Sequence, residues 1–236
     1  MDNMSPVIWF IASVLPYVTA IVFIMGIIYR IIVWIRIPLP FRYTLFPAAQ
    51  TTGGVVTSLL GDIISLRRLY KTDKPLWIGA ILFHIGLVLS ISLHVRHLIA
   101  PPEFWTALGL TEDLIFVLGS IGGVLVAVSL PYFLIRRMVI TKVKVLSTFE
   151  DYFVLVFTLI VVLFGTYMRL LRLIDPNELG AYAAGLVTLN PVAPPDHPLF
   201  FIKLLIGQIY LMYLPFSKMT MHAIGAWFNL PIVKSR

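Results

Sequence analysis

Five apolar stretches, each long enough to cross a bilayer as a helix, constrain the fold of this chain more than any other feature. They lie at about 7–34, 76–98, 112–135, 149–172 and 199–221. A hydrocarbon core of about 30 Å requires about 20 apolar residues in helical conformation. Charged residues make up only 12% of the 236 residues, fewer than a soluble domain needs to cover its surface. The sequence therefore predicts an all-α integral membrane bundle of five helices, forming a single domain over residues 1–236.

The basic residues of the connecting segments predict how this bundle is oriented. Most Lys and Arg residues lie in the first and third connections and near the C-terminus, whereas the second and fourth connections hold only Arg96, Arg169 and Arg172. By the positive-inside rule, we expect the N-terminus outside and the C-terminus in the cytoplasm. The net charge of +7 then reflects topology, so we expect no nucleic-acid partner.

We expect two of the connecting segments to have structural or binding roles besides joining the spans. Apolar residues recur at helical spacing over about 55–70, which predicts an amphipathic helix on the inner membrane surface. This helix is either an anchor or a docking face for a cytoplasmic subunit. The outer connection, 173–198, has Pro-containing ends that predict irregular structure and an apolar middle at 181–187, which either dips into the interface or covers a site there.

Two histidines, His84 and His94, lie ten residues apart in the second span. Imidazole is costly to place in hydrocarbon and is the commonest metal ligand, so the pair indicates a buried metal or haem. Ten residues of helix give about 15 Å of rise, which allows one helix to serve two cofactors stacked across the bilayer. The alternative is two hydrogen-bonded structural histidines. Gly79 and Gly86 either leave room for a flat macrocycle or serve ordinary helix packing.

The fifth span supplies polar residues at matching depths. Lys203 lies in its outer half, and His222 lies at its inner end, shortly after the segment Pro215-Phe216-Ser217-Lys218. This order of depth places Lys203 opposite His94 and His222 opposite His84.

The combined pattern resembles a known family. Leu82-Phe83-His84-x-Gly86 followed by His94, together with Gly207 eight residues before Pro215-Phe216-Ser217-Lys218, is similar to the gamma (cytochrome b) subunit of respiratory nitrate reductase. The sequence looks closer still to the cytochrome b subunits of membrane complexes associated with sulfite reduction in sulfate reducers and of membrane-bound heterodisulfide reductases. The resemblance covers about 70–230, and five spans with an external N-terminus agree with it.

The resemblance implies two b haems, one near each membrane face, held by histidines of the second and fifth spans. His84 and His94 match the family ligands directly. In the fifth span, the inner position holds Met221, with His222 one residue later. Three interpretations follow. A π-bulge or a rewound last turn brings His222 to the inner iron, or Met221 is the ligand, or His222 is merely interfacial.

Lys203 occupies the outer histidine position of the family pattern. A neutral amine can ligate iron, and burial favours the neutral form, so Lys203 is a candidate ligand of the outer haem. The alternative is a lysine that snorkels to water or to a haem propionate. In that case the outer iron is five-coordinate or takes His97 or His197 as its ligand.

A quinol site is implied beside the outer haem. Arg96, His97, Glu112 and Asp113 cluster at the outer ends of the second and third spans. Such a cluster either binds quinol oxygens and accepts their protons or simply marks the membrane boundary. With the resemblance, Arg96, His97 and Asp113 become the quinone-site candidates.

We therefore expect a dihaem cytochrome b subunit of a respiratory complex in the prokaryotic cell membrane, with menaquinol or menaquinone as substrate. The chain has no cysteine, which excludes iron–sulfur ligation by Cys within it, so electrons must continue through a partner. The resemblance implies a cytoplasmic iron–sulfur subunit similar to the heterodisulfide reductase catalytic subunit, with further membrane and extracytoplasmic subunits. The alternative is a redox-inert membrane anchor or transporter subunit.

Overall fold

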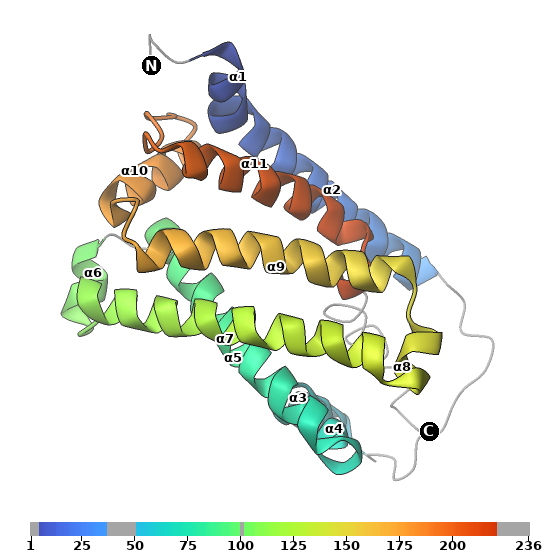
Figure 1. The fold of residues 1–236 in the computed structure, drawn as a ribbon. Coiled ribbons are helices and arrows are strands. Elements are labelled where there is room, and N and C mark those ends of the chain that lie inside the picture. Colours follow the sequence, from blue (N-terminus) through green and yellow to red (C-terminus); the bar gives the residue numbers. More distant parts are fainter. Residues whose placement is uncertain (1–4, 37–50, 100–101, 221–236) are drawn as a thin grey trace.

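The computed structural model describes residues 5–36, 51–99 and 102–220, and every regular element within these ranges is helical (Figure 1). The predicted residues Met221 and His222 lie outside the described residues, and so does the side chain of His97. The elements are α1 (Pro6–Trp9), η1 (Phe10–Val14), α2 (Leu15–Arg36), α3 (Thr52–Ser65), α4 (Arg67–Thr72), α5 (Lys74–Ile99), α6 (Pro102–Ala107), α7 (Glu112–Val139), α8 (Thr141–Leu146), α9 (Phe149–Leu170), α10 (Pro176–Val187), α11 (Pro198–Tyr213) and η2 (Leu214–Phe216).

Five helical segments of the described chain are long and apolar enough to cross a membrane. They are Pro6–Arg36, Lys74–Arg96, Glu112–Val139, Phe149–Leu170 and Pro198–Phe216. The predicted all-α membrane bundle of five spans is thus confirmed. Many of their large apolar side chains are exposed, as expected where lipid rather than water surrounds the bundle.

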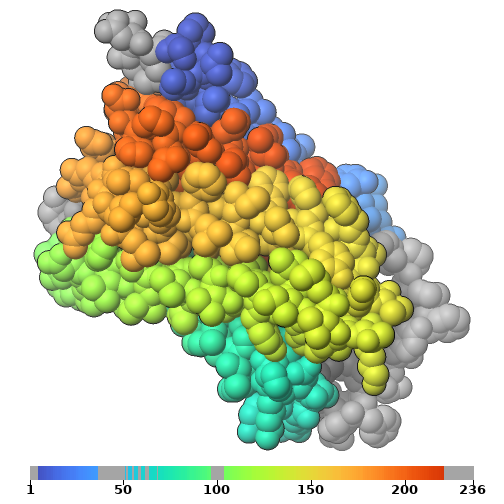
Figure 2. All heavy atoms as spheres, in the orientation of Figure 1, coloured from blue at the N-terminus to red at the C-terminus, as the bar shows by residue number. Residues whose placement is uncertain are grey.

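The spans pack in a row in which the last four follow chain order and the first lies beside the fifth. α5 packs against α7, α7 against α9, α9 against α11, and α11 against α2 (Figure 1). Figure 2 shows α11 between the first span and α9, with α7 on the other side of α9. α10 bridges one end of this row, which we call the α10 end, and α8 marks the opposite end, the α8 end (Figure 1).

Small residues bring neighbouring helices together in this row. A Cβ built at Gly86 of α5 would lie 2.7 Å from the carbonyl oxygen of Gly122 in α7. A Cβ at Gly79 would lie 2.6 Å from the ring of Tyr132, also in α7. Gly79 and Gly86 therefore serve close helix packing, and the alternative that they face a macrocycle is wrong.

The first span contains a π-helical turn, η1, and two side chains from distant elements bond to its carbonyl groups. The hydroxyl of Tyr182 in α10 donates to the carbonyl oxygen of Ala12 over 2.6 Å. The side-chain amide of Gln208 in α11 donates to the carbonyl oxygen of Ile11 over 3.0 Å. A π-helical turn disturbs the regular backbone bonds, so these donors satisfy carbonyl groups that lipid cannot. They also join the first span to α10 and α11.

The amphipathic segment before the second span differs from the prediction of one helix over about 55–70. The structure has two helices, α3 and α4, because Leu66 adopts a left-handed conformation with φ 49°. The indole of Trp77 in α5 donates to the carbonyl oxygen of Ser65 over 2.8 Å and holds the end of α3 against the span.

Asp73 precedes α5 and joins it to the end of α7. One carboxylate oxygen accepts from the amide of Leu76 over 3.0 Å, and the other accepts from Arg136. The Leu76 amide and the Arg136 guanidinium lower the pKa of this carboxyl group, although partial desolvation opposes them.

The fifth span was predicted at 199–221, but its α-helix ends at Tyr213 and continues as the short 3₁₀ turn η2. Pro215 lacks the N–H that a continuing helix needs. Arg30 of α2 donates to the carbonyl oxygens of Pro215 and Phe216, over 3.1 and 2.7 Å. Lys218 then reaches Thr148 and Asp151 near the start of α9, over 2.7 and 3.2 Å.

Candidate functional site

The two histidines of α5 are held in the same way. Nδ1 of His84 donates to the carbonyl oxygen of Ala80 over 2.6 Å, and Nδ1 of His94 donates to that of Ser90 over 2.7 Å. Because a carbonyl oxygen only accepts, each Nδ1 carries the proton and each Nε2 keeps its lone pair. Metal-binding histidines are commonly oriented by such a second hydrogen bond. Both histidines are exposed at the surface of the helix, so each Nε2 is available to a cofactor.

A cavity of about 460 Å³ lies at the α10 end and collects side chains from five helices. Its volume is within the usual range for small-molecule and cofactor sites. His94 of α5 and Lys203 of α11 both line it. The structure thus brings these two predicted residues to one site, although their roles as iron ligands stay predictions.

Lys203 points toward α9 rather than out of the bundle. A Cβ built at Gly165 of α9 would lie 3.5 Å from Cε and 3.6 Å from Nζ of Lys203. His197, an alternative ligand for the outer iron, is used otherwise, because its Nδ1 accepts from the amide of Leu199 over 3.2 Å and starts α11. A neutral ring that accepts at Nδ1 has its proton on Nε2, so it has no free nitrogen for iron.

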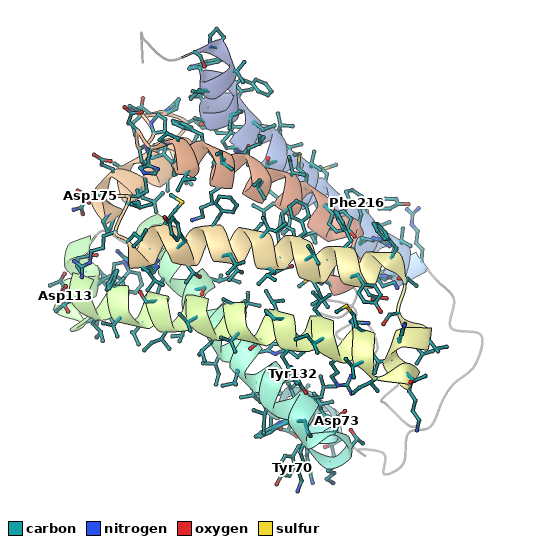
Figure 3. The ribbon with its side chains drawn as sticks, viewed as in Figure 1. Tyr70, Asp73, Asp113, Tyr132, Asp175 and Phe216 are labelled. Atoms are coloured by element: carbon teal, nitrogen blue, oxygen red, sulfur yellow. The ribbon has the colours of Figure 1, made fainter. Side chains whose placement is uncertain are left out.

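Two ion pairs stand beside the cavity. Arg96, a predicted quinone-site residue, is buried and pairs with Glu112 over 3.1 Å. Asp113, which is also a predicted quinone-site residue, pairs with Arg172 over 3.7 Å, and its side chain is 91% exposed. Arg96 and Asp113 both line the cavity, one on its inner wall and one at its mouth, and Figure 3 shows Asp113 and Asp175 at this end of the bundle.

The helix α10 covers the cavity. Leu179 and Ala183 of this helix are among the lining residues. The apolar middle of the outer connection therefore covers a site, which was one of its two predicted roles. Asp175 and Pro176 were expected in irregular structure, but they begin the helix, because the Asp175 carboxylate accepts from the amide of Asn177 and proline suits the first helical turn. The Tyr182 hydroxyl fixes α10 to the first span through its bond to the Ala12 carbonyl oxygen. Burial raises the pKa of this hydroxyl.

The lining residues that sequence reasoning missed include Met168 and Arg169. Met168 is buried and also packs in the apolar core around Tyr182 and Phe200. Arg169 was counted only among the charges of a connection. Its position inside the predicted span 149–172 was the available signal, because an arginine in a membrane helix usually has a functional reason.

The residues at this site fit a b haem. The lone pair of His94 at Nε2, a second nitrogen base at Lys203 and a largely apolar cavity between them match what such a group requires. α11 also offers room for a flat group beside Lys203, since a Cβ built at Gly207, one turn later, meets no atom within 4 Å. The inner site is represented by His84 alone, because its predicted partners Met221 and His222 lie outside the described residues.

Comparisons with known proteins agree with this geometry. The profile of the nitrate reductase gamma subunit family matches residues 68–232. The chain is 27% identical to the Hdr-like menaquinol oxidoreductase cytochrome b-like subunit of Archaeoglobus profundus, over 93% of this chain and 77% of that protein. It is 26% identical to the subunit of the same name from Archaeoglobus fulgidus, over 92% of this chain and 76% of that protein. With five membrane spans and most of its length matched, the chain belongs to the nitrate reductase gamma subunit family of prokaryotic membrane cytochromes b.

Proposed function

We propose that this chain is the dihaem cytochrome b subunit of a respiratory complex that oxidises menaquinol. The observation that carries the proposal is the shared anchoring of His84 and His94, which leaves both Nε2 atoms free along one membrane helix. The names of the two Archaeoglobus relatives, which contain both menaquinol oxidoreductase and cytochrome b, support the same function.

Each haem would be held between α5 and the fifth span. At the α10 end, His94 and Lys203 are the proposed axial ligands, since both line one cavity. Toward the α8 end, His84 is the proposed ligand, with His222 or Met221 as its partner. A bound b haem supplies one-electron transfer at each site. The protein holds the ligating nitrogens and excludes water with the apolar walls of the bundle.

The same cavity offers the proposed quinol site. Oxidation of a quinol to a quinone releases two protons, so the site needs groups that accept protons and pass them to water. Asp113 stands at the exposed mouth and Glu112 on the same helix turn beside Arg96. We assign Asp113, Arg96 and His97 to binding the quinol oxygens and to moving these protons.

Orientation and partners complete the proposal. The positive-inside rule places the α10 end outside and the α8 end, with Arg136 and Lys218, in the cytoplasm. Electrons would leave at the α8 end to a cytoplasmic iron–sulfur subunit similar to the heterodisulfide reductase catalytic subunit, since this chain has no cysteine. The surfaces of α3, α4 and α8 are the proposed docking region, and further membrane and extracytoplasmic subunits complete the complex.

The purified chain, or its complex, tests this function directly. We expect a reduced absorption spectrum of b type, two haems per chain, and reduction by a soluble menaquinol analogue. His84→Ala and His94→Ala should each remove one haem, whereas the control His197→Ala should keep both. A chain that binds no haem would contradict the proposal and favour the redox-inert anchor or transporter subunit.

A further inference from the structure

Arg169 occupies a place in the outer cavity that the proposed function does not use. It lies in the last turn of α9 and lines the same cavity as His94 and Lys203. Its guanidinium rests on α7 at Gly119, where a Cβ would lie 2.5 Å from a terminal nitrogen and 2.6 Å from the central carbon. Since Gly119 is buried, this position is open to the guanidinium only because residue 119 has no side chain.

The acidic groups that line the cavity are already engaged. Glu112 pairs with Arg96 over 3.1 Å, and Asp113 pairs with Arg172 over 3.7 Å. The Asp175 carboxylate accepts from the amide of Asn177 over 2.8 Å. Among the described residues, no carboxylate lies within 4 Å of Arg169. The charges that act on it are the like charge of Arg96 and, to a smaller extent, the opposite charge of Glu112, which is itself paired with Arg96. A cation that pairs directly with no carboxylate is unfavourable in a mostly apolar cavity, so the position of Arg169 favours binding of an anionic group.

We propose that Arg169 binds a propionate of the outer haem, the one whose iron His94 ligates. This inference rests on the proposed function. A b haem carries carboxylates at its edge, and the planar guanidinium matches a carboxylate with two parallel hydrogen bonds. Menaquinol is uncharged and cannot supply the missing counter-charge. Arg169 is thereby a positioning residue that would hold the haem by its propionate, and it leaves Lys203 available to the iron.

The test pairs a change in the protein with a change in the haem. The wild-type chain and Arg169→Gln are reconstituted with haem or with haem dimethyl ester, in which both propionates have lost their charge. The rate at which haem or its dimethyl ester passes from the chain to excess apomyoglobin is then measured. The kinetic phase that His94→Ala removes is assigned to the outer site. In the wild type we expect the ester to leave the outer site at least about tenfold faster than haem. In Arg169→Gln the two rates should be nearly equal, because the partner of the propionate is gone.

Further variants separate the role of Arg169 from effects of folding and net charge. Gly119→Ala, which pushes the guanidinium from its position, should reduce the ratio of the two rates as Arg169→Gln does. Lys144→Gln, on the exposed surface of α8, removes one charge far from the cavity and should keep the wild-type ratio. Arg169→Lys should give a ratio between those of the wild type and Arg169→Gln, because the charge remains but the bidentate geometry is lost.

Three results would overturn the inference. If Arg169→Gln keeps the wild-type ratio, another group binds the propionate, while the haem function itself stands. If haem and its ester leave the wild-type outer site at the same rate, Arg169 serves another anion such as a lipid phosphate. If the wild-type chain binds no haem at His94, the proposed function fails together with this inference.

Discussion

The side chain of Lys203 in α11 ends over Gly165 in α9, with Nζ 3.6 Å from the position that a Cβ at residue 165 would take. Lys203 thus points into the bundle and lines the same cavity as His94, as its proposed role as a ligand of the iron requires. The glycine in α9 leaves the space that this arrangement needs.

Replacing Lys203 by alanine should therefore change the spin state of one haem. We expect the outer haem to pass from low spin to high spin, observed by electron paramagnetic resonance, because one axial nitrogen is removed. Lys203→His should keep a low-spin haem, since histidine stands at this position in the family pattern. Ile202→Ala, at an exposed neighbouring position, is the control and should leave the spectrum unchanged. A low-spin outer haem that survives in Lys203→Ala would show that another group, such as the Met168 thioether, ligates the iron.

The glycines of α5 and α11 should respond in opposite ways to substitution. Gly86→Ala forces a Cβ within 2.7 Å of the Gly122 carbonyl oxygen, so we expect a loss of stability. Overpacking of this kind costs about 1–3 kcal/mol. A Cβ at Gly207 meets no protein atom within 4 Å, so in Gly207→Leu we expect the unfolding temperature of the polypeptide to change little while its haem content falls.

Thermal unfolding in detergent and haem content measured on the same samples check this contrast. Gly61→Ala, also in open space but on α3, is the control for a harmless glycine substitution and should change neither quantity. Full haem content in Gly207→Leu would mean that this face of α11 does not adjoin the cofactor.

The Asp73 carboxylate should make stability depend on acid pH. Its pKa is below the ordinary value of 3.8, chiefly because the Leu76 amide donates to it and Arg136 lies beside it. A carboxyl group with a lowered pKa in the folded state contributes stability above its unfolded pKa and loses this contribution as the pH falls through the folded value. Asp73→Asn should thus be less stable than the wild type at pH 7, and the difference should shrink once the pH is below the ordinary aspartate range.

Urea unfolding in mild detergent between pH 7 and pH 3 measures this difference. Asp196→Asn, at an exposed position in the connection before α11, is the matched control and should show no such pH-dependent difference. A constant difference across the whole range would mean that Asp73 acts through packing and not through its charge.

Tyr182→Phe should weaken the attachment of α10 to the first span. The phenol donates to the Ala12 carbonyl in the π-helical turn, and a buried carbonyl left without a donor costs about 1–3 kcal/mol. We expect a lower unfolding temperature and faster proteolysis of the segment that contains α10. Tyr167→Phe, at an exposed position on α9, is the control. Equal stability of both variants would show that α10 is held by its apolar contacts alone.

The sequence predicted the number of spans and their approximate bounds, because these depend on local composition. For the same reason it marked the second-span histidines as candidate functional residues. A run of about 20 apolar residues has few alternatives to a membrane helix, and a histidine inside such a run is conspicuous. Helix ends were less predictable. The break at Leu66 is accompanied by a contact from Trp77 in the next helix, and the turn at Pro215 by a contact from Arg30, which lies far away in the chain.

Only the tertiary structure decided which residues share the cavity at the α10 end. The sequence alone placed His94 and Lys203 at a similar depth, but depth does not state which helices are neighbours or which way a side chain points. The packing of α9 between α7 and α11 brings Arg169 onto Gly119 and Lys203 onto Gly165. The packing of α5 on α7 makes Gly86 a helix contact and not a cofactor contact. Local sequence determines that a segment crosses the membrane, because burial in lipid is a property of the segment. The placement of Arg169 and Lys203 in the same cavity as His94 depends on close packing between helices, which is a property of the whole bundle.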